Sequence, residues 1–202
     1  MDRQIIITIC REYGSMGHEI AARLAERLDV KLYDKELLYG MAEAEGMDHK
    51  IIHKYDEKAI NPFMSKTIGN HSNSIEKILA EKIFDYQRQI AATGESFVIV
   101  GRCADFILKD VPNTLRVFIT SDYNAKLTRV MEHDGLDVKA AALKIVKEDK
   151  IRRSYHNHHC DTKWGDSRAY DLTVNASKLG VDGTVEFLYN YVQLYKNNSN
   201  NK

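Results

Sequence analysis

The chain has 202 residues, and its 29 basic and 29 acidic side chains leave no formal net charge, a balance that argues against a general nucleic-acid-binding protein. This length predicts one domain with a sizeable core, and no apolar run approaches the ~20 residues that span a bilayer. The N-terminal MDRQ is unlike a signal peptide, and the three cysteines form no CxxC pair, so we expect a cytoplasmic protein with reduced thiols and no membrane partner.

The first elements in the chain are a strand, a glycine-containing loop and a helix. Residues 5–9 form a β-branched run that predicts a buried strand. Gly14 and Gly17 interrupt it, and apolar residues then recur at helical spacing from Ile20 to Leu28. This is the layout of a phosphate-binding loop, in which backbone N–H groups and a helix N-terminus face an anion. A tight turn without a ligand gives the same pattern.

The loop departs from the Walker A motif, G-x-x-x-x-G-K-[ST]. With Gly17 as the second glycine, the first glycine is replaced by Glu12, the lysine by His18 and the hydroxyl residue by Glu19. We expect Gly14 and Gly17 to take left-handed backbone angles and to keep the backbone cradle. His18 is a weaker, pH-dependent cation. Glu19 can hold Mg²⁺ through a carboxylate oxygen, but it adds negative charge beside the phosphates.

The chain continues with a short predicted strand at residues 30–33. Asp34 follows as the N-cap of a helix that opens at Lys35. Residues 35–94 are helical in pattern and are predicted to contain no strand, with breaks at residues 46–48, 61–62 and 69–70. The last helix of this stretch is predicted from residue 74 to residue 93, and Gly94 ends it. Because the stretch is too long for one crossover, we interpret it as a helical cap over the sheet edge.

The remaining elements alternate between strands and helices. Strands are predicted at residues 97–100, 115–119 and 170–174, and helices from Asp122 to His133, after Asp137, and at residues 182–195. Five strands alternating with helices predict an α/β fold with a parallel sheet. Residues 1–195 form one predicted domain, followed by a frayed tail at residues 196–202. Ligands of such sheets bind at the carboxyl ends of the strands, where residues 11–17, Asp34 and Arg102 are expected.

Two of these residues have side chains suited to phosphate chemistry. Asp34 can orient an acceptor or a Mg²⁺-bound water, and it can also act simply as a helix cap. The Arg102 guanidinium suits a phosphate or a planar base edge. Its alternative role is an ion pair with Asp105 or a loop carboxylate.

The densest charge run lies at residues 147–153. Arginines on a mobile helix can close over transferring phosphates, and we assign this role to Arg153 with Lys150 or Arg152. A solvated helix face with an i,i+4 pair between Glu148 and Arg152 is the alternative.

Residues 156–161 contain three histidines, a cysteine and an aspartate. These groups are bunched, and no second pair lies at zinc-finger spacing, so we expect no metal site and interpret the segment as a polar lid. Trp164 follows, and it can stack on a base or anchor the core.

Taken together, several segments resemble the cytidylate kinase-like proteins, relatives of cytidylate kinase among the P-loop nucleoside monophosphate kinases. The resemblance covers nearly the whole chain and is weakest at residues 44–94. Its segments are ITICREYGSMGHEIAARLAERL at residues 7–28, LYDKELL at 32–38, FVIVGRCADFIL at 97–108 and DKIRRSYHNHHCDTKWGDSRAYDLTVNASKLG at 149–180.

The resemblance implies a P-loop three-layer fold with strand order 2-3-1-4-5, a helical NMP-binding insert at residues 35–94 and a lid at residues 147–168. Cytidylate kinases hold the acceptor with a Gly-Arg-Asp segment. Here Arg102 matches, Cys103 replaces the aspartate, and Asp105 can substitute for it. The family's loop lysine has become His18, and Arg11 can supply the lost charge.

The activity implied is Mg²⁺-dependent transfer of the ATP γ-phosphate to CMP, dCMP or a related small acceptor, by a monomer or homodimer. The donor phosphates would lie on Arg11, Gly14, Ser15, Met16, Gly17, His18 and Glu19. The acceptor would lie on Asp34, Arg102 and Asp105, with Arg153 and Lys150 or Arg152 bridging the transferring group. The alternative is a weakened, regulatory nucleotide- or anion-binding module on the same fold.

Overall fold

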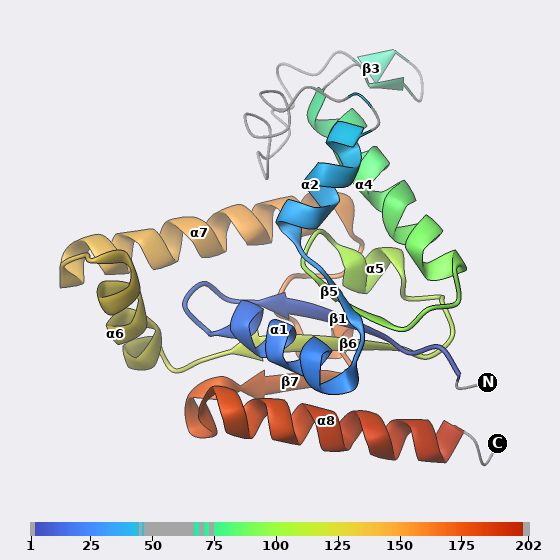
Figure 1. Cartoon of the computed structure of the whole chain (residues 1–202). Helices are drawn as coiled ribbons and strands as arrows, with labels where there is room; N and C mark the ends of the chain where they lie inside the picture. The colour runs from blue at the N-terminus through green and yellow to red at the C-terminus, as the bar shows by residue number, and fades with distance from the viewer. Residues whose placement is uncertain (1–2, 45, 47–66, 69–70, 73–74, 200–202) are drawn as a thin grey trace.

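The computed structural model describes residues 3–44, 46, 67–68, 71–72 and 75–199 (Figure 1). Its central sheet has five parallel strands, which are β1 (Ile6–Arg11), β2 (Lys31–Tyr33), β5 (Phe97–Val100), β6 (Thr114–Thr120) and β7 (Leu172–Asn175). Across the sheet they lie in the order β2-β5-β1-β6-β7. Numbered one to five along the chain, these strands have the order 2-3-1-4-5, which confirms the prediction. Ile6 of β1 lies opposite Phe97 of β5 on one side and Thr114 of β6 on the other.

Helices cover both faces of this sheet, giving three layers (Figure 1). One face packs against α1 (Gly17–Leu28) and α8 (Gly180–Ser199). The other face packs against α2 (Lys35–Ala44), α4 (Ile75–Ala92) and α5 (Ala104–Ile107). Beyond the sheet, α6 (Tyr123–Asp134) packs against α7 (Val138–His159). Two short 3₁₀ helices, Ser167–Ala169 and Ala176–Lys178, flank β7.

Strand β1 forms the centre of both cores because its side chains alternate between the faces. Ile7 and Ile9 pack in the core with α1 and α8, whereas Ile6 packs in the core with α2 and α4. All three are essentially inaccessible to solvent. On α1, Ile20 and Leu24 lie one turn apart and complete the first core. The β-branched run therefore forms a strand covered on both faces, as its composition predicts.

The prediction that residues 35–94 contain no strand is wrong. Two short strands, β3 (Thr67–Ile68) and β4 (His71–Ser72), pair antiparallel with Thr67 opposite Ser72. A Gly-Asn pair separates them in the sequence, which is a hairpin signal that the helical interpretation passed over. Of the predicted breaks, Gly46 has a positive φ of 85°. Residues 47–48, 61–62 and 69–70 lie outside the described part of the chain.

Helix α8 also differs from the sequence prediction, because it continues to Ser199. Residues 196–199, predicted to belong to a frayed tail, are therefore helical, and residues 200–202 lie outside the described chain. The extension contains no glycine or proline, and Lys196 lies in the last turn, where a cation complements the helix dipole. Of the helices described, none has the length and apolar character needed to cross a bilayer.

Candidate functional site

The loop between β1 and α1 lies at the carboxyl edge of the sheet. Gly14 has a φ of 75°, and a Cβ there would lie 3.0 Å from Cγ2 of Val130 on α6. Met16 has a φ of 65° and precedes the helix. The left-handed angles therefore fall on Gly14 and Met16, and the prediction that Gly17 takes one is wrong. Gly17 is needed for space, since a Cβ there would lie 2.5 Å from Cβ of Arg11.

This loop delivers backbone donors to the N-terminus of α1. Met16 makes no side-chain cap, and the first helical hydrogen bond runs from the Ile20 N–H to the Met16 carbonyl, at 2.9 Å. The N–H groups of Gly17, His18 and Glu19 precede that bond and have no acceptor within the helix. Together with the positive end of the helix dipole, they give this terminus the features that suit an anion.

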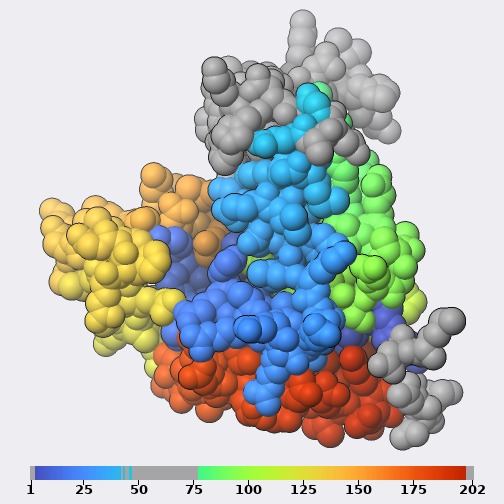
Figure 2. All heavy atoms as spheres, viewed as in Figure 1, coloured from blue at the N-terminus to red at the C-terminus, as the bar shows by residue number. Residues whose placement is uncertain are grey.

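A cleft of about 500 Å³ opens over this terminus, and we call it the donor cleft. Three arginines from different elements line it: Arg11 from β1, Arg129 from α6 and Arg152 from α7. In Figure 2 the dark-blue loop is seen between the yellow α6 region and the light-blue α2 region. The other lining residues are Glu12, Tyr13, Gly14, Met16, Gly17, His18, Glu19, Val130, His133 and Asp134.

The acidic groups that the sequence places in this cleft are compensated by cations. Glu19 pairs with Arg23 at 2.8 Å and with Arg129 at 2.7 Å. His18 lies 3.2 Å from Asp34, joining the loop to the start of α2. Asp34 also accepts a hydrogen bond from the Leu37 N–H at 3.1 Å, which confirms its predicted role as a helix cap. The charge that Glu19 brings is thus balanced before any phosphate binds.

A buried ion network under the loop was missed by the sequence analysis. Nζ of Lys126 on α6 lies 3.0 Å from the Glu12 carboxylate and 3.6 Å from that of Asp149 on α7. Asp149 also accepts a hydrogen bond of 2.6 Å from the Tyr13 N–H. Burial raises the pKa of Asp149, against the opposing effects of the Tyr13 hydrogen bond and Lys126. The network fastens the loop to α6 and α7. Glu12 belongs to the loop and Asp149 to the charge run at residues 147–153, whereas Lys126 lies in no motif of the sequence.

Arg102 lies at the end of β5, on the other side of the loop. Its residue is 6% exposed and has a φ of 53°. Its guanidinium lies 5.1 Å from the Tyr39 ring centroid and 5.7 Å from that of Tyr155. Its carbonyl accepts a 3.0 Å hydrogen bond from the buried Gln87 side chain. Helices α2, α4 and α7 therefore all hold this arginine in place.

Asp105 is a buried residue of α5 and does not line the donor cleft. It is 3% exposed, and its two oxygens accept hydrogen bonds from the Cys10 thiol, at 3.3 Å, and from Nε2 of His156, at 2.8 Å. Burial lowers the pKa of His156, but the hydrogen bond to Asp105 and smaller contributions outweigh it and raise that pKa to about 10. Asp105 is therefore engaged with core partners.

The three basic residues assigned to the lid have different surroundings. Arg152 lines the donor cleft, and its Nη1 donates a hydrogen bond of 3.3 Å to the Arg11 carbonyl. Arg153 lies 5.3 Å above the Trp164 ring and lines a separate hollow of about 240 Å³ with Glu12. Lys150 is exposed on α7. Of these three predicted residues, only Arg152 therefore lines the donor cleft.

Trp164, in the segment that follows α7, contacts both α7 and the sheet. The Trp164 N–H donates a 2.8 Å hydrogen bond to the Asn157 side chain. The Trp164 ring is 9% exposed and packs edge-on against Phe118 with the centroids 5.2 Å apart, so it anchors the core. Cys10, Cys103 and Cys160 are all buried, and none of them forms a disulfide.

Comparisons with known proteins identify relatives over most of the chain. A model of the cytidylate kinase-like family matches residues 6–178. The cytidylate kinase of Pyrococcus horikoshii is 24% identical over 182 residues, covering 89% of this chain and 84% of that protein. The cytidylate kinase of Methanopyrus kandleri is 26% identical over 193 residues, covering 91% of each.

Solved structures share the fold. An uncharacterized protein from Eubacterium ventriosum is 39% identical, with a TM-score of 0.74 over 94% of this chain and 99% of that one. Shikimate kinase from Bacteroides thetaiotaomicron is 12% identical, with a TM-score of 0.57 over 94% of this chain and 98% of that one. The second likeness concerns the fold alone.

Proposed function

The chain belongs to the cytidylate kinase-like family, and we propose that it is a cytoplasmic phosphotransferase that moves the γ-phosphate of ATP to CMP, dCMP or a related small phosphorylated acceptor. One observation carries the proposal. The loop of residues 12–16 presents the free N–H groups of a helix terminus to a cleft of about 500 Å³ that three arginines line. Phosphates are the ligands that suit such a site.

The donor phosphates would lie on the N–H groups of Gly17, His18 and Glu19. Arg11, at the end of β1, is proposed to supply part of the charge that a Walker lysine would carry. Arg152 is suited to the transferring group because it enters the cleft from α7, above the loop. Catalysis would consist of positioning and charge neutralisation, without a covalent intermediate.

The acceptor would lie on Arg102, whose guanidinium can hold a phosphate by two parallel hydrogen bonds. In the reaction, an oxygen of the acceptor phosphate forms a bond to the γ-phosphorus, while the bond from that phosphorus to the β,γ-bridging oxygen breaks and ADP leaves. Asp34 and Asp105 are proposed to orient the acceptor, Asp34 from the start of α2 and Asp105 by fixing the turn that contains Arg102.

The residues at the loop also fit a magnesium ion. Glu19 occupies the position of the Walker hydroxyl residue, and carboxylate oxygens are hard ligands of the kind that Mg²⁺ takes. Its pairing with Arg23 and Arg129 leaves lone pairs on both oxygens. When bound, Mg²⁺ would neutralise charge on the donor phosphates.

The test is a turnover assay with ATP, Mg²⁺ and a panel of CMP, dCMP, UMP and AMP, run on the wild type and on His18→Lys. Restoring one charge-assisted phosphate contact is worth about 1.5–3 kcal/mol, so we expect the variant to turn over about 10–100-fold faster. Lys31→Ala serves as a control, because Lys31 lies at the start of β2, where it pairs only at the surface with Glu95.

The alternative is a regulatory binding module on the same fold, and the altered Walker side chains favour it. For such a module, His18→Lys would change nucleotide affinity without producing turnover. Absence of turnover in both proteins, with every acceptor of the panel, would contradict the phosphotransferase. If ATP also failed to bind either protein, the binding module would be contradicted as well.

A further inference from the structure

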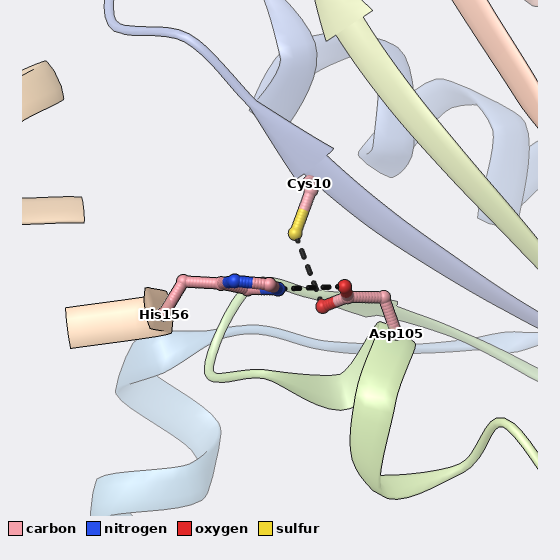
Figure 3. A group of neighbouring side chains, drawn as sticks. All are labelled: Cys10, Asp105 and His156. Atoms are coloured by element: carbon pink, nitrogen blue, oxygen red, sulfur yellow. Dashed lines mark hydrogen bonds and ion pairs between the residues drawn. The ribbon is translucent and has the colours of Figure 1, made fainter. Parts of the chain in front are cut away.

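Three metal-ligating side chains meet in the core, and none of them lines the donor cleft (Figure 3). They come from distant parts of the sequence: Cys10 from β1, Asp105 from α5 and His156 from α7. One ligand atom from each lies within 4.8 Å of the other two, and all three residues are buried. Cys10 is 4% exposed, and the other two residues are each 3% exposed.

The distances between these atoms are close to those of a metal site. Sγ of Cys10 lies 3.3 Å from Oδ1 of Asp105, and Nε2 of His156 lies 2.8 Å from Oδ2. Zinc bonds of about 2.0–2.3 Å in a tetrahedron place ligand atoms about 3.4–3.6 Å apart. These two pairs would therefore need to separate by less than about 1 Å to admit an ion, and the third pair, Cys10 and His156, has its ligand atoms within 4.8 Å of each other.

His156 reaches Asp105 through Nε2, so this ring nitrogen, and not Nδ1, is the atom that the imidazole offers to the cluster. A buried charge pair is moreover weak evidence of a purely stabilising role, because desolvation offsets its attraction.

We propose that Cys10, Asp105 and His156 form a buried site for a divalent transition-metal ion, with Zn²⁺ as the preferred ion. A thiolate, an imidazole and a carboxylate are ligands that Zn²⁺ takes, whereas a thiolate ligand disfavours Mg²⁺ and Ca²⁺. Binding replaces one proton on the Cys10 thiol and one on the imidazolium by a single divalent cation, so the buried cluster keeps a net charge of zero.

A fourth ligand has room beside the cluster. A cavity of about 20 Å³ is lined by Cys10, Cys103 and His156, among others. A water molecule needs about 10–15 Å³ measured in this way, so one water can complete a tetrahedron. Because the ligands belong to β1, α5 and α7, the ion would fasten α7 to the sheet next to Arg102. The site does not depend on phosphoryl transfer.

The test is titration of the full-length, metal-free, reduced protein with Co²⁺ alone and then with Zn²⁺. We expect one equivalent of Co²⁺ to give the thiolate-to-cobalt charge-transfer absorption of a cysteine ligand, and Zn²⁺ to displace it. Absence of this absorption in the folded wild type overturns the proposal without the need for any variant.

Two variants of the proposed ligands and one control variant test where the ion binds. Cys10→Ser is expected to remove the thiolate absorption and Asp105→Asn to weaken Zn²⁺ binding more than about 100-fold, since even partners of metal ligands contribute 10–100-fold. His158→Gln is the matched control, because His158 is an exposed histidine on the same helix. Loss of binding in the control, or unchanged cobalt absorption in Cys10→Ser, would overturn the proposal.

Discussion

The donor cleft and the region around Arg102 lie on either side of the same loop but are built differently. The donor cleft is open, about 500 Å³ in volume, and its charged side chains are held by ion pairs with one another. The Arg102 region has a cavity of only about 20 Å³, which Cys10 and His156 also line, and its guanidinium lies 5.1 and 5.7 Å from the ring centroids of Tyr39 and Tyr155. Under the proposed function, the open side held by ion pairs takes the triphosphate of the donor, and the closely packed side takes the acceptor.

The largest effect is expected at Lys126, whose ion pairs join the loop to α6 and α7. Lys126→Met removes the cation that separates the Glu12 and Asp149 carboxylates and leaves both near each other and largely buried. Breaking a buried pair in this way costs about 3–5 kcal/mol. We expect that loss in the free energy of unfolding measured with urea. A loss below about 1 kcal/mol would mean that the loop is held by other contacts.

On the other side of the loop, Arg102→Lys keeps the charge but removes the planar fork and its contacts with Tyr39 and Tyr155. Charge-assisted hydrogen bonds contribute about 1.5–3 kcal/mol, so we expect kcat/KM for the acceptor to fall about 10–100-fold. The KM for ATP should change little. An equal effect on both substrates would contradict the separation of the two sides.

The third test compares two glycines. Gly17→Ala places a Cβ 2.5 Å from Cβ of Arg11, and overpacking of this kind costs about 1–3 kcal/mol. Gly40→Ala is the matched control, because Gly40 lies inside α2 with no atom within 4 Å of the added Cβ. It should stabilise the protein by about 0.5–1 kcal/mol. Thermal melting of both variants checks the opposite signs.

The smallest effect is expected at Asp134, on the rim of the donor cleft. The hydrogen bond from His133 lowers the pKa of Asp134 most, burial opposes it, and hydrogen bonds from Lys144 and Tyr13 lower it further, to about 2. A carboxylate whose pKa is lowered in the folded state stabilises the fold above its unfolded pKa of about 4, and this contribution is lost as the pH falls through 2.

The corresponding variant is Asp134→Asn. It should be less stable than the wild type by less than about 1 kcal/mol at pH 7, and the difference should vanish between pH 4 and pH 2. Urea unfolding at a series of pH values measures this. A difference that persists unchanged at pH 2 would show that the Asp134 carboxylate charge is not its source.

How far the sequence predicts this molecule depends on the range of the interactions involved. Strand β1 and helix α1 were predictable because the periodicity of Ile7, Ile9, Ile20 and Leu24 records burial locally. The strand order followed from the family resemblance. The left-handed angle at Met16 was not predictable from the sequence, where it was expected at Gly17. Gly17 is instead needed because its backbone passes close to Arg11, and that contact exists only in the folded turn.

The missed groups share one physical cause, which is that their members meet only in three dimensions. Lys126 carries no motif and joins Glu12 to Asp149 across 114 and 23 positions of the chain. The sequence pattern suggested metal ligands only in the bunched residues 156–161, and no second pair lay at zinc-finger spacing elsewhere in the chain. The proposed ligands instead combine His156 with Cys10 and Asp105 from two other elements. Arg152 and Arg153 are neighbours in the sequence, but they project from α7 in different directions, so that Arg152 lines the donor cleft and Arg153 a separate hollow.

The most direct measurement of the central claim is calorimetric titration of the wild-type protein with a non-hydrolysable ATP analogue and Mg²⁺, with and without CMP. Two adjacent nucleotide sites predict micromolar binding of the analogue that CMP strengthens. If neither nucleotide binds at millimolar concentration, the donor cleft is not a nucleotide site, and the phosphotransferase assignment is contradicted.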